Sequence, residues 1–171
     1  MISGLGCQAT IVLYDGSPFY PDINVLWDLA DRAQINVFGT SAKYLDACRK
    51  SGASIAQTHD LSSIDTILST GSPLAPSSFD YVYTQVKNDV RLSSISGGTD
   101  IVGCFASGSS VLPVRRGEIQ TLSLGMKVEV FDEGGVSVTQ QKGELVCTAP
   151  FPSMPIGLWD DPDGKLYLST Y

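Results

Sequence analysis

The stretch from residue 66 to residue 100, TILSTGSPLAPSSFDYVYTQVKNDVRLSSISGGTD, decides the fold class. It holds two short β-rich runs, 66–69 and 90–95, on either side of a run, 77–87, in which apolar residues recur at helical spacing. A strand, a helix and a second strand make a crossover unit, and such units build parallel sheets. The stretch therefore predicts an α/β fold in which these two strands are parallel.

The sequence before this stretch shows the same alternation. Residues 8–14 and 35–38 have the composition of strands. Asp22 is placed to cap a helix with apolar residues at helical spacing, and a second helix is predicted over 41–50. We therefore expect a parallel β-sheet with crossover helices over about residues 1–106.

After residue 106 the pattern changes. Glycines, prolines and short β-rich runs follow one another, with strands predicted at 127–131, 136–138 and 144–148 and no helix. Alternating apolar and polar residues in the first of these runs favour a sheet with one wet face. We expect residues 107–171 to form a small antiparallel β lobe of the same domain, truncated at its end.

Composition and charge narrow the class of protein. The chain has 171 residues, of which 43% are hydrophobic and 17% charged, which is typical of a globular protein. The formal net charge of −7 argues against binding to a nucleic-acid backbone, which needs clustered Lys and Arg. A small anionic ligand stays possible, because backbone N–H groups and a metal ion can bind phosphate without a basic surface.

Cysteine spacing and the two chain ends suggest a cytoplasmic protein and a longer parent chain. The four cysteines stand far apart, and the single histidine, His59, has no nearby Cys, so no zinc site is expected. We expect reduced, buried cysteines. No apolar run reaches the about 18 residues of a membrane span, and the start lacks a basic signal-peptide region. Both ends predict an internal piece of a longer protein.

The segment SISGGTD, residues 94–100, carries the strongest chemical signal. It follows a predicted parallel strand at its carboxyl end, where α/β sheets bind ligands. Its two glycines let the backbone approach a ligand, Thr99 offers a hydroxyl to a phosphate oxygen, and Asp100 is a hard oxygen ligand suited to Mg²⁺. The same residues could also form only a tight turn with a capping Asp.

A second loop, residues 70–74, ends the neighbouring predicted strand. Gly71 permits a positive φ, and Pro73 fixes the next backbone step. The loop could be a plain strand-to-helix connector, but together the two loops could flank one flat ligand. The chain has no G-x-S-x-G serine elbow and no G-x-x-x-x-G-K-[ST] phosphate loop, so those chemistries are not expected.

The order of these motifs resembles the adenylate-forming superfamily, which includes acyl-CoA synthetases, peptide adenylation domains and luciferases. The branch of acetyl-CoA and acetoacetyl-CoA synthetases is the most similar. The segments that carry the resemblance are 37–41, 70–73, 94–100, 143–145, 156–161 and 167–171.

This resemblance implies an ATP-dependent acid–thiol ligase. Its expected reaction converts acetoacetate, ATP and CoA into acetoacetyl-CoA, AMP and pyrophosphate through an acyl-adenylate. ATP, Mg²⁺, CoA and a short acid are the implied cofactors and partners, with no nucleic acid and no membrane. The alternatives are a fragment of another short-chain acyl-CoA synthetase, or a nucleotide-binding α/β module without catalysis.

The resemblance also implies a role for each matching residue. Thr99 and Asp100 would be catalytic, with Thr99 on the α-phosphate and Asp100 as the Mg²⁺ ligand. The implied nucleotide-binding residues are Gly71, Ser72, Pro73, Ser94, Ile95, Ser96, Gly98 and Thr99. The implied acyl-pocket residues are Phe38, Gly39, Thr40, Thr70 and Gly97.

The sequence departs from the family pattern at three positions and lacks several of the family's motifs. Asp100 replaces the usual Glu, and Ser72 replaces another Glu. Gly97 stands where acetyl-CoA enzymes carry a Trp, so we expect its missing side chain to leave space for acetoacetate. The family's phosphate loop, ribose Asp, hinge and catalytic Lys have no counterpart in this sequence, so we expect the isolated chain to be inactive.

Overall fold

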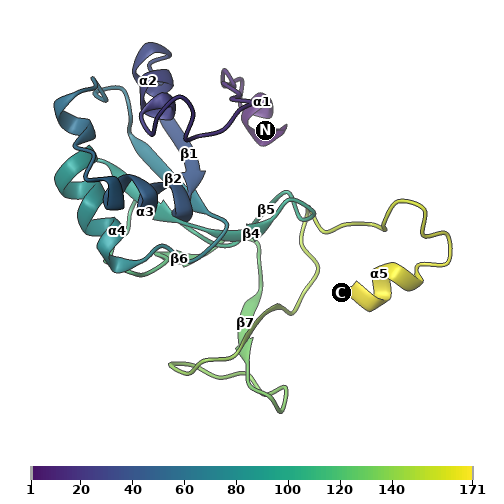
Figure 1. Ribbon diagram of the computed structural model, residues 1–171. Helices are drawn as coiled ribbons and strands as arrows, with labels where there is room; N and C mark the ends of the chain where they lie inside the picture. Colours follow the sequence, from purple (N-terminus) through teal and green to yellow (C-terminus); the bar gives the residue numbers. More distant parts are fainter. Residues whose placement is uncertain (1, 171) are drawn as a thin grey trace.

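A three-stranded parallel sheet lies among the helices in the compact part of the molecule (Figure 1). The computed structural model describes residues 2–170. The strands are β1 (Val37–Ser41), β2 (Thr66–Thr70) and β3 (Arg91–Ser94), and they lie side by side in chain order. This arrangement confirms the predicted α/β fold with a parallel sheet.

Helical crossovers connect these strands, as predicted. Helix α2 (Val25–Arg32) precedes β1, and α3 (Ala42–Ser51) joins β1 to β2, followed by the short 3₁₀ helix η1 (Ile55–Gln57). Helix α4 (Pro76–Tyr81) and the π-helical turn η2 (Val82–Val86) join β2 to β3. The π-helical turn lies within the single helix predicted over 77–87.

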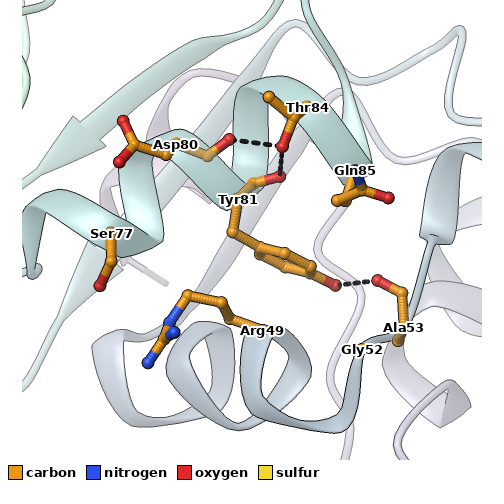
Figure 2. Close-up of a pocket in the computed structure, with 8 residues that line it drawn as sticks. All are labelled: Arg49, Gly52, Ala53, Ser77, Asp80, Tyr81, Thr84 and Gln85. Carbon is orange, nitrogen blue, oxygen red and sulfur yellow. Dashed lines mark hydrogen bonds between the residues drawn. The ribbon is translucent and has the colours of Figure 1, made fainter.

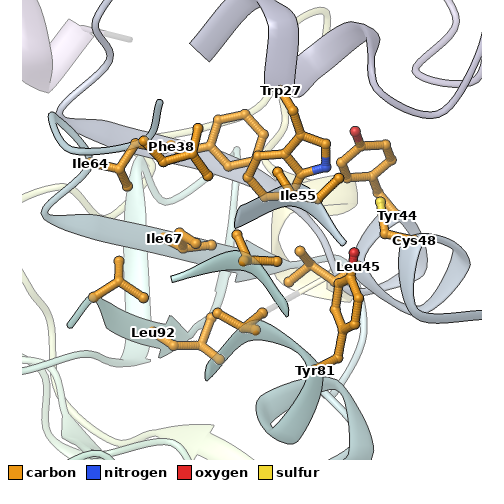
Figure 3. Close-up of a cluster of buried hydrophobic side chains, with 14 of the residues drawn as sticks. Trp27, Phe38, Tyr44, Leu45, Cys48, Ile55, Ile64, Ile67, Tyr81 and Leu92 are labelled. Atoms are coloured by element: carbon orange, nitrogen blue, oxygen red, sulfur yellow. The ribbon is translucent and has the colours of Figure 1, made fainter. Parts of the chain in front are cut away.

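One face of the sheet is covered by these helices and forms the core (Figure 3). Phe38, Ile67 and Leu92 are aligned across the three strands and are all buried. Trp27 from α2 stacks on Phe38 with ring centroids 4.6 Å apart, and Tyr44 from α3 lies 6.0 Å from Trp27. The Tyr44 hydroxyl is satisfied because it donates to the Ile23 carbonyl at 2.7 Å.

The opposite face of the sheet is covered only in part. Val37 on β1 is 56% exposed, whereas Ser93 on β3 is buried. Gly108 lies so close to Ser93 that a Cβ at residue 108 would come within 2.6 Å of the serine Cβ. The segment after residue 107 therefore crosses this face near β3 and leaves β1 uncovered.

A small antiparallel sheet continues directly from β3. It contains β4 (Ser96–Gly98), β5 (Gly103–Ser107) and β6 (Thr121–Leu122). The sequence predicted 96–100 as a loop, which is wrong for β4. The reason is that β4 pairs through its backbone, and its two glycines give no side-chain pattern to detect.

A second antiparallel pair, β7 (Val128–Phe131) and β8 (Glu144–Cys147), projects away from the body of the molecule (Figure 1). Two of the three predicted strands of this region are thus confirmed. The third, over 136–138, is reduced to one bridge between Ser137 and Phe131. The domain boundary predicted near residue 106 falls within β5 and stays a prediction.

Two further expectations were wrong. Residues 8–14 form no strand, because the structure gives them no neighbouring strand to pair with. The region after residue 107 does contain a helix, α5 (Lys165–Thr170), where the Asp161 carboxylate accepts from the N–H groups of Leu166 and Tyr167 at 3.1 and 2.8 Å. The remaining helix is α1 (Ile2–Gly6). None of the helices described within residues 2–170 combines the length and the apolar character that a membrane span requires.

Candidate functional site

The two loops singled out from the sequence meet at the carboxyl edge of the parallel sheet. The Ile95 N–H donates to the Ser69 carbonyl at 2.9 Å, which keeps the ends of β2 and β3 together. Between the loops lies a cavity of about 370 Å³. It is lined by Thr70, Gly71, Ser72, Pro73, Leu74, Ser94, Ile95, Ser96, Gly97, Gly117, Glu118 and Ile119.

Local backbone chemistry shapes the first loop. Gly71 has a φ of 84°, a left-handed conformation that L side chains rarely adopt. Leu74 is 4% exposed and anchors the end of the loop in the core. Pro76 then starts α4 in the first turn, where a missing N–H costs nothing. The loop is therefore a defined turn rather than an unstructured connector.

The second loop bends from one sheet into the other. Ser94, the last residue of β3, has a buried side chain, and the register shifts between Ser96 and Gly97. A Cβ at Gly97 would lie 2.5 Å from the Cα of Cys104, and closer still to the carbonyl oxygen of Gly103. A side chain at residue 97 would therefore meet the backbone of β5, and the expectation that Gly97 leaves space for a larger acyl group stays a prediction.

A third wall, residues 117–119, was missed by sequence reasoning. Gly117 has a φ of 81°, and a Cβ there would lie 3.0 Å from the Pro76 side chain. Arg116 pairs with Asp80 through two hydrogen bonds of 2.7 and 2.8 Å. These bonds lower the pKa of the Asp80 carboxyl and raise the pKa of Arg116. The only sequence signal was the basic pair at residues 115–116.

Thr99 and Asp100 do not line this cavity. Both are exposed and lie in the turn between β4 and β5, where the Val102 N–H donates to the Thr99 carbonyl at 3.3 Å. The Asp100 carboxylate lies directly against Gly98, where any Cβ would collide with it. Gly98 does not line the cavity either, so the Thr99 hydroxyl and the Asp100 carboxylate follow a residue that is itself outside the lining.

The side chains around Asp100 limit the kind of metal site that it could form. Within residues 2–170 no group of three or more His, Cys, Asp or Glu side chains could hold an ion. Mg²⁺ commonly binds through one or two carboxylates together with substrate phosphates and water. Asp100 therefore fits as one ligand of a Mg²⁺–nucleotide complex and does not fit as part of a protein-only metal site.

The predicted acyl-pocket residues separate into two places. Thr70 and Gly97 line the cavity. Phe38 instead packs in the core against Trp27, and Gly39 lies on the open side of β1, where an added Cβ would meet no atom within 4 Å. Thr40 is half-buried on the same strand. The cavity thus contains only part of the expected acyl pocket.

A second cavity, of about 390 Å³, lies on the outer surface between α3 and α4 (Figure 2). The hydroxyls of Tyr81 and Thr84 in its wall already have partners within the chain. The Tyr81 hydroxyl donates to the Ala53 carbonyl at 2.8 Å, and the Thr84 hydroxyl donates to the Asp80 carbonyl at 2.8 Å. We assign this cavity no ligand.

Two acetoacetyl-CoA synthetases align with the whole chain in sequence. An acetoacetyl-coenzyme A synthetase of Rhizobium meliloti is 57% identical over 171 residues, and one of Mus musculus is 50% identical over the same length. The chain is covered completely, but it spans only 26% and 25% of these relatives. This agrees with the expectation of a fragment.

Solved structures agree with the fold. The acetoacetyl-CoA synthetase from Streptomyces lividans matches 99% of this chain and 27% of its own, with a TM-score of 0.89 and 45% identity. An anthranilate CoA ligase in complex with anthranoyl-AMP shares the fold, with a TM-score of 0.73 at 20% identity. The sequence pattern of the AMP-binding enzyme family matches residues 1–155. The chain therefore belongs to the AMP-binding enzyme family.

Proposed function

We propose that this chain forms the base-binding part of an ATP-dependent ligase that makes acetoacetyl-CoA, AMP and pyrophosphate from acetoacetate, ATP and CoA. The observation that carries the proposal is the cavity between the ends of β2 and β3, in a chain whose relatives at 57% and 50% identity are acetoacetyl-CoA synthetases. Because the chain spans about a quarter of those relatives, the complete reaction belongs to the larger protein.

The cavity suits a flat base with polar edges. Pro73, Ile95 and Ile119 supply apolar walls, while the backbone of 71–73 and the hydroxyls of Ser94 and Ser96 supply hydrogen-bonding groups. Thr70 borders this space and is proposed to lie near the acyl group. The proposed role of Gly97 is to let β4 approach β5 closely, and this close approach shapes the wall of the cavity to which Gly97 belongs.

The phosphate chemistry is proposed for the turn beyond the cavity. Thr99 would donate its hydroxyl to the α-phosphate, and Asp100 would hold Mg²⁺. Mg²⁺, when bound, neutralises phosphate charge. The protein's own contribution is to hold the acid and the α-phosphate in line and to place donors where charge develops.

The surroundings of the reaction are proposed from composition and cysteine state. The four cysteines are all free thiols, which favours a reducing compartment such as the cytoplasm. The net charge of −7 supports small-molecule partners rather than nucleic acid.

A nucleotide titration tests the site. We expect ATP with Mg²⁺ to bind the chain weakly, with a Kd of about 1 mM or more, and to shift the amide signals of 71–72 and 94–97. Gly71→Ala should weaken binding, because its φ of 84° is strained for any L side chain. Gly52→Ala is the matched control, since Gly52 also has a positive φ, 73°, but lies far along the chain at the end of α3.

An activity assay tests whether the chain alone can carry out the first step of the proposed reaction. The chain alone should show no acetoacetate-dependent ATP–pyrophosphate exchange at micromolar concentration, because it lacks the phosphate loop and catalytic Lys of the family. Exchange above a control without enzyme would contradict this expectation. Amide shifts confined to the groove between α3 and α4 would contradict the proposed nucleotide site.

A further inference from the structure

We propose that Glu118 sets which way round the nucleotide lies in the cavity. Its carboxylate would accept a hydrogen bond from the exocyclic amine of the base and would repel the phosphates. This inference rests on the nucleotide binding proposed above. It adds a specificity-determining residue in the third wall, outside the two loops that the sequence indicated.

The backbone that carries Glu118 is fixed on its N-terminal side. The Glu118 N–H donates to the Arg115 carbonyl at 3.1 Å, which closes a turn. Arg116 is tied to Asp80 on α4 by two hydrogen bonds, and Gly117 packs on Pro76 at the start of that helix. The turn is thus attached to the same helix that the first loop leads into.

The segment is also fixed on its C-terminal side. The Gln120 side chain accepts from the Ser109 N–H at 3.0 Å and donates to the Leu112 carbonyl at 2.7 Å. These contacts tie the segment to the stretch that crosses the sheet near Ser93. Glu118 is therefore presented to the cavity by a wall that is held at both ends.

Charge is what distinguishes Glu118 from its neighbours. Among the cavity-lining residues it alone has an ionisable side chain, and the others are glycine, hydroxyl-bearing or apolar. Its side chain is exposed, and no residue within 2–170 forms an ion pair with its carboxylate. An occupant of the cavity therefore meets one uncompensated negative charge.

A nucleotide responds to this charge in opposite ways at its two ends. A carboxylate only accepts hydrogen bonds, so it is attracted to an amine on the base. The triphosphate carries only negative charge and acceptors, so it is repelled. The favoured orientation puts the amino edge of the base at Glu118 and directs the phosphates away from it, and this predicts a purine with an exocyclic amine as the ligand class.

Uncharged nucleosides separate the amine from the phosphates. The whole chain is titrated with adenosine and with purine riboside, which lacks the amine, while amide shifts are followed. We expect the chain to bind adenosine about threefold more tightly than purine riboside, and Glu118→Ala to remove this preference. Glu133→Ala, at an exposed glutamate in the 132–135 turn, removes the same charge elsewhere and should leave the preference intact.

The charge itself is tested with ATP. Glu118→Gln should leave the ratio of ATP to adenosine affinity unchanged, because the phosphates lie far from residue 118 in the proposed orientation. A selective gain in ATP affinity would place the phosphates at Glu118 and overturn the orientation. An unchanged adenosine preference in Glu118→Ala would overturn the role of the carboxylate.

The outcomes also separate this inference from the proposed function. If no nucleotide or nucleoside shifts the amides of 71–72 or 94–97 in the unaltered chain, the nucleotide site is wrong, and the role of Glu118 falls with it. If those amides shift while the Glu118 variants behave like the unaltered chain, the site stands and only the Glu118 inference is wrong.

Discussion

Replacing Gly97 with Ala should destabilise the β4–β5 pair, and the structure gives the size of the effect. The new Cβ would lie 2.5 Å from the Cα of Cys104 and 3.0 Å from the carbonyl carbon of Gly103. Both are backbone atoms that cannot rotate away. Restoring ordinary carbon–carbon contact requires the strands to separate by roughly 1 Å at this pair.

Such a separation has a cost that can be worked out. Overpacking costs about 1–3 kcal/mol, and each backbone hydrogen bond lost beside Gly97 adds about 1 kcal/mol. We therefore expect a loss of about 3 kcal/mol in the free energy of unfolding. Gly39→Ala is the matched control, because Gly39 is also in a strand but has no atom within 4 Å of its Cβ position. That variant should be neutral or stabilised by up to about 1 kcal/mol.

Two measurements check this prediction. Urea unfolding gives the difference in stability between the variants, and amide exchange reports whether β4 and β5 open locally. If Gly97→Ala is as stable as Gly39→Ala, the close approach at Gly97 is not real and the reasoning fails. A Gly97→Trp variant, intended to shrink the acyl pocket, should lose structure before it changes substrate preference.

Three further predictions concern the core and the surface. Trp27→Ala should reduce the free energy of unfolding by about 3–5 kcal/mol, measured by urea unfolding, because the indole is fully buried against its aromatic neighbours. The pKa of Asp80 is lowered beside Arg116, so their ion pair should stabilise the fold above the usual carboxyl pKa. This contribution should be lost as the pH falls through the lowered pKa. In Asp80→Asn, the free energy of unfolding measured against pH should no longer show this loss. A thiol reagent at pH 8 should label the exposed Cys7 and spare Cys48 until the chain unfolds, as judged by peptide mass, because burial raises the pKa of the Cys48 thiol.

Local sequence patterns were enough for the parallel half of the fold. The helical spacing over 41–50 and 77–87 corresponds to α3 and to α4 with η2, and the β-rich run that follows each of them corresponds to β2 and β3. Each of these elements buries an apolar face, so the spacing of its apolar residues along the sequence reveals it. The strand predicted over 8–14 failed because β-rich composition does not supply a pairing partner.

The loops 70–74 and 94–97 were also indicated by the sequence, because strands that run parallel end at the same edge. Their glycines were visible, but the reason for each was not. Gly71 is needed for its left-handed backbone, whereas Gly97 is needed because another strand lies against it. A single sequence cannot distinguish these two demands, since both appear as the same residue.

The sequence by itself determined the crossover units, the order of the motifs and the two loops at the carboxyl edge. Tertiary structure alone decided that residues 117–119 form the third wall, that Thr99 and Asp100 do not line the cavity, and that Phe38 belongs to the core. The physical reason is the separation along the chain of the residues that interact. Periodicity and turn chemistry act between residues close in the chain, whereas Arg116 reaches Asp80 across 36 positions, and only the folded backbone brings such residues together.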